Sequence, residues 1–158
     1  VLLDMNTTLE RVVRLVSSDA VIRSVTIELD FTPDMAIVRG NRVELQQVVL
    51  NLLLNALDAV SRSEERRITV RTLLTPEGIE VSVEDSGHGL AAGTEEKIFE
   101  PFFTSKPDGM GMGLSVARSI IEAHHGRIWC ESQPGNRTAF TFEIPVSRSD
   151  VPLAGSVR

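Results

Sequence analysis

Hydrophobic positions recur along the chain with helical spacing in three stretches. The strongest is residues 42–60, where apolar residues fall three and four apart and form one broad face for burial. An earlier helix is predicted to begin at Asn6 or Thr7, residue types that cap helices, and to run to about residue 16 or beyond. The third is predicted over residues 113–125, because a glycine follows as a stop signal.

Alternating apolar and polar residues predict strands in most of the remaining chain. Proline, glycine and aspartate between the runs mark turns, and residues 76–78 join two runs as in a β-hairpin. A short helix is also expected at 94–98. The predicted strands are 25–31 with a short partner at 36–39, the hairpin of 67–74 with 78–84, and the last pair, 127–132 and 138–145.

Length and composition indicate one globular domain. The 158 residues are enough to bury a single core, and 42% hydrophobic with 24% charged residues is ordinary for such a domain. We expect the domain to span residues 1–146. The tail at 147–158 contains proline, glycine and serine, and we expect it to be disordered. The first residue is Val, which suggests a piece of a longer protein.

Charge, cysteine content and hydropathy narrow the class of function. A net charge of -6 opposes nonspecific binding to nucleic acid, because no basic field attracts a phosphate backbone. Cys130 is the single cysteine, so no intrachain disulfide can form, which fits a cytoplasmic location. We expect Cys130 itself to be a small, half-buried residue of a strand. The apolar runs are far shorter than the roughly 20 residues of a membrane span. We therefore expect no membrane contact by this domain.

A line of polar residues runs along the predicted helix 42–60, away from its apolar face. Gln47, Asn51, Asn55 and Asp58 follow spacings of four, four and three, which places them in one narrow stripe. Such a stripe can simply be a solvated face. However, asparagine is a poor helix former, so two of them one turn apart in a leucine-rich helix also suggest a binding role.

Asp85 stands where a predicted strand ends and a glycine cluster begins. Its carboxylate can accept a hydrogen bond from the exocyclic amine of adenine, whereas guanine presents a carbonyl at that position. Gly87 and Gly89 allow the backbone to pass against a base without a Cβ in the way. For this motif alone, a turn with a capping aspartate remains the alternative.

A second glycine cluster, with Gly109, Gly111 and Gly113, precedes the third predicted helix. Free amides and the positive end of the helix dipole favour phosphate oxygens there. No Gly-Lys-Ser/Thr follows, so the cluster is not a P-loop. Residues 104–112 have little apolar content and several hinge residues, and we expect them to form a flexible lid anchored by the apolar patch at 99–103.

The two asparagines suit phosphoryl transfer. Asn55 offers a neutral oxygen of the kind that Mg2+ accepts alongside waters and phosphates. Asn51 lies one turn earlier, where a carboxylate could activate water, but an amide is not a strong base. This favours transfer of a phosphoryl group to another acceptor over hydrolysis.

These motifs, in this order, resemble the catalytic ATP-binding domain of bacterial sensor histidine kinases, in the superfamily that also holds DNA gyrase, the heat-shock-90 chaperones and the mismatch-repair ATPases. Each motif is weak alone, but four in order make a specific signal, and the resemblance covers residues 2–145. The motifs are QQVVLNLLLNALDA at 46–59, DSGHGL at 85–90, FEPFFTSK at 99–106 and GMGMGLS at 109–115.

The resemblance implies a fold and a set of site residues. The fold is an α/β two-layer sandwich, with a mixed, mainly antiparallel sheet covered on one face by about three helices, and a flexible ATP lid. Asn55 would be the Mg2+ ligand, Asn51 a polar partner near the phosphates, and Asp85 the acceptor of the adenine amine. The remaining cofactor-binding residues would be Gly87, Gly89, Lys106, Gly109, Gly111, Gly113, Leu114 and, through water, Thr138. For Lys106, a solvated loop lysine is an equally good interpretation.

Two features need separate interpretation. Many relatives carry Lys where this chain has Asp58, which could instead hold a metal-bound water or an arginine. The Asn-Ala-x-Asp-Ala ending of the first motif resembles that of the nitrogen-regulation subclass of kinases. None of His88, His124 and His125 lies in a motif like that of the phosphorylated histidine, so we expect structural or solvated roles for them. The acceptor histidine would lie on a separate domain.

We therefore expect a domain that binds ATP and Mg2+ and transfers the γ-phosphate to a histidine in two-component signal transduction. Its partners would be its own dimerisation and phosphoacceptor domain and a downstream response regulator. The isolated domain would be a monomer and the parent protein a homodimer. The alternatives are a serine kinase of the anti-sigma-factor type, an ATPase relative, or a noncatalytic module that binds nucleotide or a partner protein.

Overall fold

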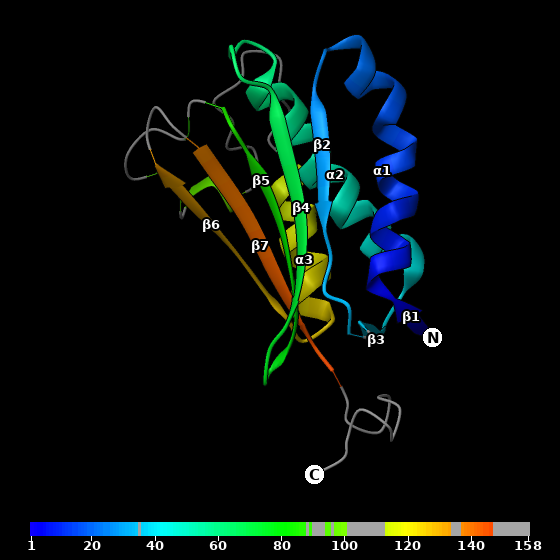
Figure 1. Cartoon of the computed structure of the whole chain (residues 1–158). Coiled ribbons are helices and arrows are strands. Elements are labelled where there is room, and N and C mark those ends of the chain that lie inside the picture. Colours follow the sequence, from blue (N-terminus) through cyan, green and yellow to red (C-terminus); the bar gives the residue numbers. More distant parts are fainter. Residues whose placement is uncertain are drawn as a thin grey trace.

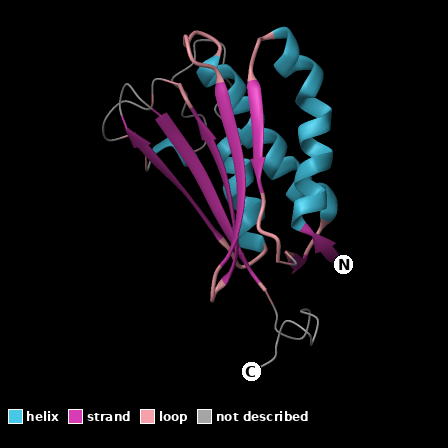
Figure 2. Cartoon of the chain, viewed as in Figure 1, coloured by secondary structure: helices cyan, strands magenta, loops and turns pink. Residues whose placement is uncertain are grey.

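Three helices cover one face of a five-stranded sheet, so that the molecule has two layers (Figure 1; Figure 2). The computed structural model describes residues 1–34, 36–87, 89, 94–95, 97–100, 113–133 and 137–146. The helices are α1 (Met5–Ile22), α2 (Arg42–Val60) and α3 (Gly113–Ala123), with a 3-10 turn, η1 (Lys97–Phe99). The strands are β1 (Leu2–Asp4), β2 (Thr26–Asp30), β3 (Ile37–Arg39), β4 (Arg67–Leu74), β5 (Gly78–Asp85), β6 (Arg127–Gln133) and β7 (Arg137–Pro145).

The sheet is mixed and mainly antiparallel, as expected. Its order is β2-β4-β5-β7-β6; β2 pairs with β4 in parallel, and the other three pairs are antiparallel. The predicted hairpin of β4 and β5 is confirmed, with Ile68 opposite Asp85 and Leu74 opposite Ile79. The strand β5 therefore lies in the centre of the sheet, and its last residue is Asp85.

Helix α2 has the predicted bounds because the sequence provides a capping residue at its start and one apolar face along its length. Asn41 caps its first turn by accepting a hydrogen bond from the Glu44 amide at 3.0 Å. By length and composition alone this helix could cross a membrane, but its apolar side is packed in the core of the sandwich. The buried residues of this face are Leu45, Val48, Val49, Leu52, Leu53, Ala56, Leu57 and Val60.

Two sequence-based expectations are wrong in detail, and a third is met in part. The short strand at Ile37–Arg39 does not pair with β2; it pairs with β1 in a separate two-stranded sheet, while β2 joins β4. Helix α1 is capped by Asp4, which accepts from the Asn6 amide at 3.0 Å, because the Asn6 side chain bonds Thr32 and Thr72 instead. At 94–98, the Ile98 amide donates to the Thr94 carbonyl at 2.9 Å, as in a helical turn that begins at Thr94, and among the described residues the 3-10 turn η1 covers Lys97–Phe99.

Helix α3 also ends earlier than predicted, at Ala123. His125 has a φ of 64°, so the backbone leaves the helix there, and the Gly126 amide donates back to the Ile121 carbonyl at 2.9 Å. The expected lid, the end of the apolar patch at 101–103, the turn at 134–136 and the tail at 147–158 lie outside the described residues. Phe99, from the start of the patch, is buried and packs edge-on against Phe140.

Candidate functional site

The site is built around the end of the central strand β5. Asp85 is only 2% exposed, because its position in the alternating strand points its side chain at the helices instead of solvent. Such burial is unusual for a carboxylate. Its Oδ1 accepts a hydrogen bond from the Gly87 amide at 2.9 Å. Its Oδ2 is buried and has no hydrogen-bond partner among the described residues. A buried acceptor without a donor is costly, and this one fits a ligand that brings a donor.

Burial changes the protonation of this carboxylate. Burial raises the pKa of Asp85 from 3.8 to about 6. The hydrogen bond from the Gly87 amide opposes this shift, and the neighbouring charge of Glu84 adds to it. The group is therefore ionised at neutral pH and able to accept a hydrogen bond, while it gains a proton in mildly acidic solution. Perturbed carboxyl groups of this kind are typical of functional sites.

Thr138 lies beside Asp85 in the sheet. The two residues are paired in register across β5 and β7, and Thr138 is 3% exposed. Its hydroxyl lies 3.2 Å from that of Ser132 on β6. The structure thus brings together two polar side chains that are far apart in the sequence.

The first glycine motif packs tightly against the protein. A Cβ at Gly87 would lie 2.7 Å from the carbonyl oxygen of Ala59, at the end of α2. Gly89 has a φ of 77°, and a Cβ there would lie 2.3 Å from the Gln133 carbonyl oxygen. Both positions therefore need glycine to seat the loop after Asp85, besides the expected close approach to a base.

One residue of the polar stripe of α2, Asn51, contacts the start of α3. Asn51 and Asn55 are half-buried, whereas Gln47 and Asp58 are exposed. The Asn51 amide donates to the Gly113 carbonyl at 3.0 Å, which ties α2 to the first residue of α3. A side chain that holds the end of the glycine cluster in place is well suited to position a phosphate-binding loop.

Asp58 pairs with an arginine, one of the two partners considered from the sequence. Its Oδ1 lies 3.1 Å from Nη1 of Arg23, at the end of α1. The role of Arg23 could not be found from the sequence, since 35 residues separate the two. Leu114 is half-buried against the core, and Lys106, Gly109 and Gly111 lie outside the described residues.

Two histidines can be placed in the structure. The ring of His124 accepts a hydrogen bond at Nε2 from the Asn41 amide at 3.1 Å, and its Nδ1 lies 2.8 Å from the Ile120 carbonyl. These contacts require a neutral ring with its proton on Nδ1, and they fasten the end of α3 to the start of α2. His125 is exposed just after the helix. Structural and solvated roles, as expected, account for both; His88 lies outside the described residues.

No cluster of three or more acidic, histidine or cysteine side chains able to hold a metal ion occurs in the described part of the chain. A metal here would need ligands of another kind, such as an amide oxygen with phosphates and water. Asn55 provides such an oxygen. Cys130, half-buried on β6, is not a candidate ligand or nucleophile, because burial and nearby acidic groups raise the pKa of its thiol to about 12.

Comparison with known proteins identifies the family. Residues 40–148 match the family model described as histidine kinase-, DNA gyrase B-, and HSP90-like ATPase. The sensor protein FixL of Bradyrhizobium diazoefficiens is 40% identical over 126 residues, which are 79% of this chain and 25% of that protein. The sensor histidine kinase ZraS of Klebsiella oxytoca is 40% identical over 145 residues, which are 91% of this chain and 31% of that protein.

A solved structure has the same fold over nearly the whole chain. The catalytic domain of histidine kinase ThkA superposes with a TM-score of 0.84 at 31% identity, covering 95% of this chain and 97% of that one. The chain spans less than a third of the length of the FixL and ZraS relatives. The chain belongs to the family of histidine kinase-, DNA gyrase B- and HSP90-like ATPases, as an ATP-binding domain of the sensor histidine kinase type.

Proposed function

We propose that this domain binds Mg-ATP and donates its γ-phosphate to a histidine on another domain of the same parent protein. The observation that carries the proposal is the buried Asp85 carboxylate, with one oxygen bonded to the following turn and the other without a partner among the described residues. A carboxylate in that state matches the exocyclic amine of adenine.

The remaining roles follow from where the residues lie. Thr138 supports adenine from β7 through water, while Gly87 and Gly89 hold the loop against which the base rests. Asn55 supplies an amide oxygen to Mg2+, whose charge neutralises the phosphates. Asn51 positions the start of α3 through Gly113, so that the amides there face the phosphates. Lys106, Gly109, Gly111 and Leu114 complete the proposed phosphate side.

The protein contributes positioning more than covalent chemistry. In the transfer, the bond between the γ-phosphorus and its bridging oxygen breaks as a bond to an imidazole nitrogen forms, and ADP leaves. No carboxylate stands at position 51 to activate water, which favours the histidine acceptor over hydrolysis. Relatives named as sensor histidine kinases support this choice over a serine kinase or a noncatalytic module.

The partners and location are part of the proposal. A similar structure contains the histidine kinase ThkA in complex with the response regulator protein TrrA, at 30% identity and a TM-score of 0.79, covering 93% of this chain and 42% of that one. By analogy, we place this domain in the cytoplasm, next to a dimerisation domain that carries the acceptor histidine, with a response regulator as the next recipient. We expect the isolated domain to be a monomer and the parent protein to be a homodimer.

Calorimetry with a nonhydrolysable ATP analogue and Mg2+ tests the adenine assignment. Asp85→Asn should weaken binding at least about tenfold, because an amide NH2 faces the adenine amine where an acceptor is needed. Glu80→Gln is the matched control, since it neutralises a carboxylate on the opposite face of the same strand. Equal affinity of Asp85→Asn and wild type would overturn the assignment.

The pH dependence gives an independent check. Affinity should be constant above about pH 7 and fall about tenfold per unit below pH 6, where Asp85 gains a proton and ceases to accept. In Asp85→Asn this fall should be absent.

Phosphoryl transfer is tested with the purified histidine-containing hairpin of the parent protein and labelled ATP. Acid-labile phosphate on the hairpin is expected, and Asn55→Ala should abolish it together with the Mg2+ dependence of nucleotide binding. Nucleotide binding without any labelled hairpin would instead favour a noncatalytic module.

A further inference from the structure

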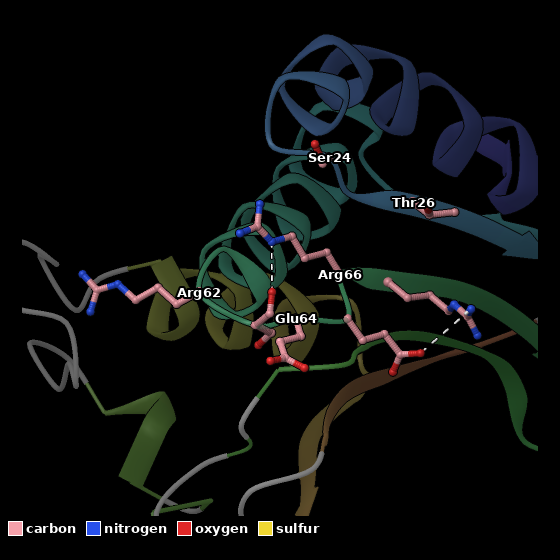
Figure 3. Close-up of a pocket in the computed structure, with 8 residues that line it drawn as sticks. Ser24, Thr26, Arg62, Glu64 and Arg66 are labelled. Atoms are coloured by element: carbon pink, nitrogen blue, oxygen red, sulfur yellow. Dashed lines mark hydrogen bonds and ion pairs between the residues drawn. The ribbon is translucent and has the colours of Figure 1, made fainter.

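Two buried side-chain oxygens have no hydrogen-bond partner in the part of the chain that the structure describes, Ser63 Oγ and Asp85 Oδ2. Ser63 belongs to the lining of a polar hollow beyond the end of α2, where acidic and basic side chains mix (Figure 3). None of the proposed nucleotide-binding residues lines that hollow. The Asp85 oxygen is therefore the one of the two that belongs to the proposed site, and a physical reason is needed for its lack of a donor.

Asp85 begins a row of polar side chains that crosses three strands. Asp85 on β5 is paired in register with Thr138 on β7, and Thr138 is paired with Ser132 on β6. Residues paired in this way point to the same face of a sheet, with Cβ atoms about 4.5–5.5 Å apart. Thr138 thus stands between a carboxylate and a hydroxyl. Rotation about its χ1 angle would carry its own hydroxyl from one neighbour to the other.

The Ser132 hydroxyl sets the direction of the Thr138 hydroxyl. It donates to the Arg137 carbonyl at 3.2 Å and lies 3.2 Å from the Thr138 hydroxyl. Serine has one hydroxyl proton, so with that proton on the carbonyl, Thr138 is the donor to Ser132. The Thr138 proton is therefore used on the β6 side, and Thr138 keeps its lone pairs for the water through which it is proposed to support adenine.

We propose that Ser132 is a positioning residue of the nucleotide site, which holds the Thr138 hydroxyl on the β6 side and so leaves the Asp85 oxygen open to the base. The inference rests on the proposed function. A threonine hydroxyl turned towards the buried carboxylate would form a charge-assisted hydrogen bond with it, and the adenine amine would then have to displace that bond. Ser132 also borders the proposed base-binding loop, because a Cβ on Gly89 would lie 3.0 Å from its Oγ.

Calorimetry with a nonhydrolysable ATP analogue and Mg2+ measures the consequence for binding. Ser132→Ala should weaken binding about tenfold, because the released Thr138 hydroxyl competes for Asp85. Ser132→Thr retains a hydroxyl and should bind within about twofold of wild type. Ser82→Ala is the matched control and should leave affinity unchanged, since Ser82 lies 3.0 Å from the Thr141 hydroxyl in an equivalent pair on the opposite face of the sheet. Unchanged affinity in Ser132→Ala would overturn the proposal.

A second background shows whether Ser132 acts through Thr138. In Thr138→Val there is no hydroxyl to hold, so adding Ser132→Ala should not weaken binding further. The same tenfold loss in both backgrounds would contradict the proposal, because Ser132 would then act on the nucleotide or its loop without Thr138.

Carboxyl carbon NMR of the nucleotide-free domain tests the contact independently of binding. The pKa of Asp85, about 6 in the wild type, should fall towards 3.8 in Ser132→Ala, because a hydrogen bond from Thr138 stabilises the ionised carboxylate. In the Thr138→Val background the same substitution should leave this pKa unchanged. An unaltered pKa in Ser132→Ala would overturn the positioning role. Absence of nucleotide binding by the wild type would instead refute the proposed function, so the two failures are distinguishable.

Discussion

Removing the charge of Asp85 should make the nucleotide-free domain more stable. Burial raises the pKa of this carboxyl from 3.8 to about 6, a difference of about 2 units. At about 1.4 kcal/mol per unit, ionised Asp85 costs the folded state about 3 kcal/mol above pH 6. In Asp85→Asn the amide keeps the acceptor for the Gly87 N–H, but its NH2 group is buried with no partner among the residues that the structure describes. A buried donor without a partner costs about 1–3 kcal/mol, so the expected net gain is about 0–2 kcal/mol.

The pH dependence follows from the direction of the shift. Because the folded-state pKa lies above the unfolded value, the folded domain holds a proton that the unfolded chain releases between pH 3.8 and about 6. The stability associated with this group is complete below pH 3.8 and is lost as the pH rises through 6. The free energy of unfolding of Asp85→Asn relative to wild type should therefore be highest near neutral pH and fall by about 3 kcal/mol towards about pH 4.

Urea unfolding followed by circular dichroism measures this difference. The free energy of unfolding of both proteins should be compared at about pH 8, 6 and 4, with Glu80→Gln as the control expected to change it by less than about 0.5 kcal/mol. A destabilised Asp85→Asn near pH 8, or a difference that does not vary with pH, would refute the reasoning. It would show that the ionised carboxylate has a stabilising partner.

Three further substitutions test the packing. Phe140→Ala should lower the free energy of unfolding by about 3–5 kcal/mol in urea titrations, because the ring is fully buried; a loss below 1 kcal/mol would contradict its place in the core. Gly89→Ala should cost at least about 1 kcal/mol, since φ is 77° and the new Cβ would meet the Gln133 carbonyl; unchanged stability would refute that geometry. Arg23→Gln should cost no more than about 1 kcal/mol, as its pair with Asp58 is solvent-exposed; a double-mutant cycle measures the coupling.

The elements with the strongest local patterns could be predicted from the sequence. Helix α2 begins and ends where predicted, because a capping asparagine and an apolar face of five turns leave no competing structure. The hairpin of β4 and β5 is equally local, since a proline-glycine turn joins two alternating runs. Where one short segment sets the outcome, hydrophobic pattern and turn chemistry suffice.

Elements determined by distant contacts could not be predicted. A strand of three residues such as Ile37–Arg39 carries no information about its partner, and its pairing with β1 depends on how α1 packs. The early end of α3 depends on the side chain of His124, which reaches the start of α2. Sequence reasoning had no means to anticipate either contact.

The candidate site divides in the same way. The residues at 51, 55 and 85 could be proposed from the sequence because four motifs occur in the order of a known family, although each motif alone also fits a solvated face or a turn. The Asp85 oxygen that has no partner in the described part of the chain, and the raised pKa of this carboxyl, are tertiary properties, since they arise from burial between the sheet and the helices. The bond from Asn51 to Gly113 likewise depends on how two helices approach each other.

The central position of β5 bears on how the protein opens locally. Amide hydrogens in a strand bonded on both sides exchange with solvent only when the sheet itself opens, whereas edge strands and helix ends fray more readily. Asp85 belongs to β5, between β4 and β7, so its backbone should be among the slowest to exchange deuterium. The edge strands β2 and β6 can then fluctuate without moving the carboxylate, and a partner that docks at either edge would leave the proposed base-recognition group in place.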